Sequence, residues 1–170
     1  MTLTVDDLIA KQEITDLVGR YMRGLDRLDR ELLRSVFHDD AYTDYGFFKG
    51  RADAFVEMAV NALKDHLANH HMIGQTNIDI QQDIAFGEIY FQAFHRILVK
   101  EEERDLFISG RYVDRYQKRD GEWKIIFRSE VNDWARNDPA SDGYFKAQPD
   151  SLRGARKPDD AIYHIPPKNH

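Results

Sequence analysis

Two adjacent histidines, His70 and His71, stand at the start of a segment in which residue types alternate as in a β-strand. Successive side chains of a strand point to opposite faces of a sheet, so only one of the two can enter a pocket on one side. This geometry excludes both as ligands of a single metal ion. An imidazole can accept and return a proton near neutral pH, so the inward-facing histidine is a candidate general acid or base.

Further polar and aromatic side chains could face the same pocket. His95 lies in the next strand-like segment, Asp26 lies where the first predicted helix ends, and Tyr45 lies in a short strand. A carboxylate can orient an imidazole, and a tyrosine hydroxyl can polarise a carbonyl of a substrate. The other candidates for the lining of the pocket are Tyr21, Phe91, Ser109, Arg111, Asn132 and Trp134.

Several candidates also have a purely structural interpretation. A strand histidine can be a surface residue or a core group with a satisfied hydrogen bond. Asp26 can cap the helix that follows it. Tyr21 and Tyr45 can be packing residues, and Arg111 can be an exposed strand charge. Composition and pattern alone leave these alternatives open.

The first part of the chain predicts helices. Thr4 followed by Asp7 is a variant capping box, which predicts that a helix begins there. A second short helix, a short strand over residues 41–48 and a third helix over 51–68 are expected to follow. The apolar face of the first helix comprises Ile14, Leu17, Val18, Tyr21 and Leu25.

The rest of the body predicts long strands. Four segments with a period of two span residues 70–81, 86–100, 105–118 and 123–135. An Asp-Gly pair at 120–121 lies between the last two and is a strong hairpin signal. Ser109 and Arg111 should share one face of the third strand, and Asn132 and Trp134 one face of the fourth. Helices followed by a meander of strands predict an α+β fold, with helices on one face of a curved antiparallel sheet.

Composition limits the class of protein. The chain has 170 residues, a formal net charge of -6 and no cysteine, which fits one domain without disulfides or thiolate metal sites. No basic stripe suited to nucleic acid is present, and no apolar run reaches the length of a membrane span. We see no secretory signal at the start and expect a cytoplasmic protein without nucleic-acid or membrane partners.

The last part of the chain has a different composition. All five prolines lie between residues 139 and 167, and Tyr144, Phe145, Ile162 and Tyr163 provide apolar side chains that could be buried. We therefore expect residues 1–135 to form the domain proper and residues 136–170 to be its C-terminal arm or lid, docked rather than disordered.

Several of these residues occur in an order that resembles a known family. The string from His70 to Thr76, Leu25-Asp26, Asp44-Tyr45 and Gly87 followed by His95 are similar to scytalone dehydratase and its SnoaL-like relatives in the NTF2-like superfamily. Ser109 and the hairpin from Tyr116 to Lys124 extend the match, which covers about residues 5–134.

The resemblance implies a cone-shaped NTF2-like fold with a curved mixed or antiparallel sheet and the N-terminal helices on its concave face. It also implies a cofactor-free site, often in a homotrimer, that acts on a small molecule. By that resemblance His71 is the general acid or base paired with Asp26, Tyr45 polarises a carbonyl, and His95 and Ser109 complete the polar lining. Related enzymes with such a site are hexachlorocyclohexane dehydrochlorinase and bile-acid 7α-dehydratase.

Two positions depart from the pattern of scytalone dehydratase. Leu25 stands where a second tyrosine is expected, and Arg111 stands in place of an asparagine. Scytalone itself is therefore not the expected substrate. Arg111 suggests an anionic oxygen in the pocket if it points inward, and Tyr21 could replace the missing tyrosine.

We thus expect a dehydratase-type lyase for a small apolar, aromatic or polycyclic hydroxy compound. A retro-aldol lyase or an isomerase could use the same base. A second alternative is a metal site formed by His71, His95 and Asp26, which would be the two-histidine, one-carboxylate set of non-haem iron. A third is a non-catalytic small subunit of a ring-hydroxylating dioxygenase, which would have the same fold.

Overall fold

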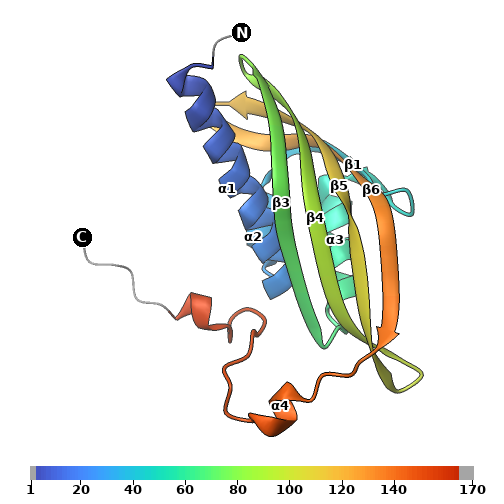
Figure 1. The fold of residues 1–170 in the computed structure, drawn as a ribbon. Helices are drawn as coiled ribbons and strands as arrows, with labels where there is room; N and C mark the ends of the chain where they lie inside the picture. The colour runs from blue at the N-terminus through green and yellow to red at the C-terminus, as the bar shows by residue number, and fades with distance from the viewer. Residues whose placement is uncertain (1–2, 165–170) are drawn as a thin grey trace.

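The computed structural model describes residues 3–164, and within them helices lie on one side of a curved sheet (Figure 1). The helices of this layer are α1 (Val5–Arg27), α2 (Arg30–Ser35) and α3 (Ala52–Leu63). The strands are β1 (Phe37–Asp44), β2 (Lys49–Arg51), β3 (Ala68–Gln81), β4 (Ile84–Val99), β5 (Glu102–Arg119) and β6 (Glu122–Pro139). A short helix α4 (Tyr144–Ala147) and a 3-10 turn (Ala161–Tyr163) follow. No helix of the described part is long and apolar enough to cross a membrane.

The sheet is mixed, and its strand order is β2-β1-β6-β5-β4-β3. β1 pairs with β6 in parallel, whereas the other pairs are antiparallel. Asp120 and Gly121 join β5 to β6 with φ values of 52° and 81°, the left-handed conformation that a tight hairpin turn requires. The predicted α+β architecture and this hairpin are therefore confirmed.

The capping box of α1 is also confirmed, because Thr4 Oγ1 accepts from the Asp7 backbone and Asp7 Oδ2 accepts from the Thr4 backbone. The helix ends at Arg27, and Leu28 then adopts a left-handed conformation with φ 51°. Asp29 caps α2 by accepting from Leu32 N over 3.2 Å. Asp26 is thus not the cap of the second helix.

The predicted bounds of two elements were wrong. β1 spans Phe37–Asp44 instead of residues 41–48, because the buried Phe37 pairs with Ile125 of the central strand β6, and Tyr45 lies directly after the strand and not within it. The third helix ends at Leu63 instead of residue 68, since the chain must turn before it enters β3 at Ala68.

A bulge in the β5–β6 ladder determines which side chains of β6 face the helices. Asn132 lies opposite Gly110 and Trp134 opposite Ser109, so Asp133 is the extra residue. A Cβ at Gly110 would lie 2.1 Å from the Val131 carbonyl oxygen, which no side chain could tolerate. The bulge turns Asn132 and Trp134 to opposite faces of the sheet, so the prediction that they share one face was wrong.

A buried ion pair lies in the core between the layers. Arg128 Nε and Nη2 donate to the Asp114 carboxylate over 2.8 and 2.6 Å, and both side chains are fully buried. The rings of Tyr21 and Tyr112 both contact the guanidinium, with each centroid 4.1 Å from its carbon, and the two rings are nearly perpendicular to each other. The pair ties adjacent strands β5 and β6 to the helix layer through Tyr21.

Removal of one partner should be strongly destabilising. Asp114→Asn leaves the Arg128 charge buried without a counter-charge, and we expect the free energy of unfolding to fall by about 3–5 kcal/mol. Asp40→Asn is the matched control, because it breaks only the exposed pair with Arg119 and should change the stability far less. Urea unfolding of both variants measures the difference, and equal losses would contradict this account of the core.

Candidate functional site

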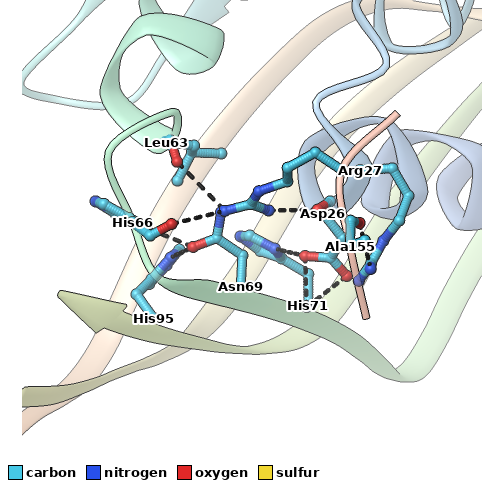
Figure 2. Close-up of polar contacts among 9 residues, drawn as sticks. Asp26, Arg27, Leu63, His66, Asn69, His71, His95 and Ala155 are labelled. Atoms are coloured by element: carbon cyan, nitrogen blue, oxygen red, sulfur yellow. Dashed lines mark hydrogen bonds and ion pairs between the residues drawn. The ribbon is translucent and has the colours of Figure 1, made fainter. Parts of the chain in front are cut away.

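An aspartate at the end of α1 and a histidine on β3 form a close pair (Figure 2). His71 Nδ1 lies 2.7 Å from Asp26 Oδ1, and the His71 backbone N–H donates to both carboxylate oxygens over 3.1 and 3.0 Å. The side chains are 6% and 9% exposed for His71 and Asp26. The expected pairing of Asp26 with His71 is present, and it is nearly shielded from water.

This geometry sets the tautomer of His71. An ionised carboxylate can only accept hydrogen bonds, so Nδ1 carries the proton that points to Asp26. Nε2 of the neutral ring then keeps its lone pair on the side away from the carboxylate. His71 is therefore oriented as a base with a negative charge behind it, which would stabilise the imidazolium once a proton is taken.

His95 lies beside this pair on β4. Its ring centroid is 5.0 Å from that of His71, and the two planes are nearly perpendicular. Burial lowers the pKa of His95 to about 3, and the neighbouring His71 and His66 act in the same direction. His95 is thus a neutral imidazole, suited to donate or accept a hydrogen bond but not to act as a cationic acid.

Strand register places His71 and His95 on the face of the sheet that carries the helices. His71 lies opposite Ala93 and His95 opposite Asn69, and all four belong to that inner face. His70 lies opposite Phe94 and is exposed on the outer face. The alternation that admits only one of the two adjacent histidines is confirmed.

Two tyrosine hydroxyls form a second polar group inside the layer interface. The hydroxyl oxygens of Tyr21 and Tyr45 are 2.6 Å apart, and both side chains are buried. Burial raises the pKa of Tyr21 to about 12 and that of Tyr45 well above its usual value. Both hydroxyls stay protonated at neutral pH. When one tyrosine hydroxyl donates to the other, the accepting hydroxyl still has its own hydrogen to donate to another acceptor.

Aromatic rings pack around this tyrosine pair. Phe91 is buried and stacks on Tyr112, with ring centroids 4.5 Å apart. Tyr45 stacks on Phe55 of α3 at 4.4 Å. The sequence therefore placed Tyr21, Tyr45 and Phe91 on the correct side of the sheet.

Glu130 is an acidic side chain of the inner face that the sequence analysis missed. It lies on β6 opposite the buried Tyr112. Burial raises the pKa of the Glu130 carboxyl, while Asn132, His71 and Arg128 act in the opposite direction. A carboxyl group that is more easily protonated than usual therefore lies within electrostatic reach of His71.

Three of the predicted pocket residues belong to the other face. Ser109 and Arg111 do share a face, but it is the outer one: Ser109 Oγ donates to the Phe91 carbonyl, and Arg111 pairs with Glu88 and Asp133. Trp134 follows them to that face because of the bulge and is 47% exposed. The prediction that these three side chains line an inner pocket was wrong.

Asn132 stays on the inner face, opposite Gly110, but its side chain is exposed. The inner face does carry a fixed cation, but it is Arg128, which pairs with Asp114 across strands β5 and β6. The alternation of Arg128, Glu130 and Asn132 along a strand was a signal that could have identified this inner row. Alternation counted from Trp134 could not identify this row, because the bulge changes which residues of β6 face inward.

A surface groove of about 430 Å³ gives access to the pair from the side of α1 and β3. Its walls include Asp26, His71, Met22 and Ile73. Among the described residues, no group of three or more His, Cys, Asp or Glu side chains is arranged to hold a metal ion. Asp26 already uses its carboxylate on His71, so these residues form a hydrogen-bonded pair and not the facial ligand set.

Comparison with known proteins places the chain in a family. A family model described as the SnoaL-like domain matches residues 6–129. An uncharacterised protein of Mycobacterium tuberculosis is 26% identical over 133 residues, which cover 76% of this chain and 89% of the relative.

Solved structures share the fold. A proposed scytalone dehydratase of Novosphingobium aromaticivorans superposes with a TM-score of 0.73 at 23% identity, over 82% of this chain and 94% of that one. A hexachlorocyclohexane dehydrochlorinase of Novosphingobium barchaimii superposes with a TM-score of 0.70 at 19% identity, over 78% and 92%. With the domain match over most of the body and the sheet and helices as described, the chain belongs to the SnoaL-like family of the NTF2-like fold.

Proposed function

We propose that this protein is a cofactor-independent lyase that eliminates water, or a similar small group, from a small apolar hydroxy compound. The observation that carries the proposal is the shielded hydrogen bond between Asp26 and His71, which leaves His71 Nε2 as a free base. Neutral hydrogen-bond donors also lie between the helices and the sheet, namely His95 and the Tyr21–Tyr45 pair.

The proposed elimination needs only one imidazole. His71 Nε2 takes a proton from a carbon next to a carbonyl or phenol, and the electron pair of that C–H bond forms a C=C bond. The C–O bond to the leaving hydroxyl breaks, and the imidazolium returns the proton to that oxygen, so water leaves. Atoms and electrons balance without an oxidant or reductant.

The remaining polar groups would act on charge that develops on the substrate. General acid–base catalysis contributes about 10²–10⁴-fold, and a preorganised donor to an oxyanion adds about 2.7–4 kcal/mol. The Tyr45 hydroxyl, with Tyr21 behind it, is our candidate for that donor. The apolar side chains of Met22 and Ile73 in the wall of the groove favour an apolar substrate.

The comparisons support the same class of reaction. Structures with this fold include one named a hexachlorocyclohexane dehydrochlorinase and one named a proposed scytalone dehydratase. Both names describe eliminations.

Substitution of the base should remove the activity. His71→Gln keeps a polar side chain but cannot return a proton, so we expect kcat to fall by about 10²–10⁴-fold on whichever substrate the wild type converts. The assay uses a panel of activated hydroxy-carbonyl compounds and aromatic diols. His164→Gln is the matched control, since this exposed histidine follows the 3-10 turn and does not belong to the groove, and it should stay within about twofold of wild type. Equal turnover by wild type and His71→Gln would exclude His71 as the base.

Loss of the orienting charge should be non-additive with loss of the base. Asp26→Asn removes the charge that stabilises the imidazolium, and we expect kcat to fall by about 10²–10⁴-fold. Because the two residues act as one unit, the Asp26→Asn, His71→Gln double variant should be no slower than His71→Gln alone. Losses that multiply across the double variant would contradict a shared role.

A further inference from the structure

An arginine from the C-terminal segment reaches the site, although it lies outside the residues matched by the family. Arg156 donates to the backbone carbonyl of Asp26 and, through Nη2, to that of His66 over 3.2 Å. Arg27 holds the segment in place by donating to the Ala155 carbonyl and to Asp160, each over 2.8 Å. Figure 1 shows this segment crossing from the end of β6 back towards α1.

Arg156 also determines the orientation of the Asn69 amide. The two ends of an amide have nearly the same shape but opposite roles, and a guanidinium can only donate hydrogen bonds. The Asn69 oxygen therefore faces Arg156, 3.0 and 2.8 Å from its two terminal nitrogens. The NH₂ group then points the other way, 3.0 Å from Nδ1 of both His66 and His95. Figure 2 shows the Asn69 amide beside these two histidines, drawn in the opposite orientation with its oxygen toward them.

The orientation of Asn69 sets the tautomer of His95. An amide NH₂ cannot accept a hydrogen bond, so a neutral His95 that faces it cannot carry its proton on Nδ1. The proton lies on Nε2, which points away from Asn69. His95 is buried, 6% exposed, and its low pKa keeps the ring neutral.

We propose that Arg156 is a positioning residue that fixes His95 in the Nε2–H tautomer through the Asn69 amide, so that the C-terminal segment completes the site. The two histidines then have opposite tautomers. His71 is bound at Nδ1 by a carboxylate and presents a lone pair, whereas His95 is bound at Nδ1 by an amide NH₂ and presents a hydrogen. The catalytic consequence, a base beside a neutral donor to a substrate oxygen, rests on the proposed function. The tautomer assignment does not.

Long-range ¹H–¹⁵N spectra of the full chain test the assignment without a substrate. The wild type should show His95 protonated at Nε2 and not at Nδ1. Asn69→Asp replaces the NH₂ with an acceptor, as at the Asp26–His71 pair, and should move the proton of His95 to Nδ1. Arg156→Met removes the cation that orients the amide and should give a mixture of both tautomers.

Two variants separate this role from a merely structural one. Arg156→Lys keeps a donor cation and should retain the Nε2–H tautomer, while Arg153→Met, which alters an exposed arginine of the same segment, should leave the spectrum unchanged. On a converted substrate, we expect Asn69→Asp to reduce kcat by about 10²-fold, the effect of losing one oxyanion donor.

A wild-type His95 protonated at Nδ1 would overturn the proposal, and so would an unchanged His95 in folded Arg156→Met. If Arg156→Met does not fold, Asn69→Asp decides. A His95 that keeps its hydrogen on Nε2 opposite a carboxylate would show that the side chain at position 69 does not set its tautomer. Failure of the lyase proposal would appear separately, as His71→Gln with full activity while the His95 spectra behave as expected.

Discussion

The site depends on one carboxylate at the point where the first helix meets the sheet. Asp26 lies at the end of α1 and accepts from both the backbone and the imidazole of His71 on β3. These hydrogen bonds hold the end of α1 against the edge strand β3, and they also orient the imidazole ring of His71. Because the carboxylate is shielded from water, its charge acts on the imidazole with little screening.

The interior around this pair holds polar groups whose protonation states are set by burial. The ion pair of Arg128 and Asp114 satisfies its charges internally, and the tyrosine pair stays neutral. His95 is neutral because burial disfavours its cation, and Glu130 is shifted toward its protonated form for the corresponding reason. This combination gives one free base among neutral donors, an arrangement suited to proton transfer in an elimination.

Much of this arrangement could be predicted from the sequence, and the failures have a common cause. The capping box, the Asp-Gly hairpin and the α+β order follow from local patterns, and the pairing of Asp26 with His71 came from the resemblance. Ser109, Arg111 and Trp134 were misplaced because strand alternation groups side chains without saying which group faces the helices, and the bulge at Gly110 reverses the parity of β6. The contact of Arg156 with Asn69 joins residues far apart in the chain, and no local pattern could have identified it.

The ring nitrogen that carries the hydrogen of His71 can be measured directly. In a long-range ¹H–¹⁵N spectrum of the wild type near neutral pH, the neutral His71 side chain is predicted to carry its hydrogen on Nδ1 and to have an unprotonated Nε2. A His71 signal with the hydrogen on Nε2 would mean that the carboxylate does not hold the ring as described, and it would contradict the assignment of this residue as the base.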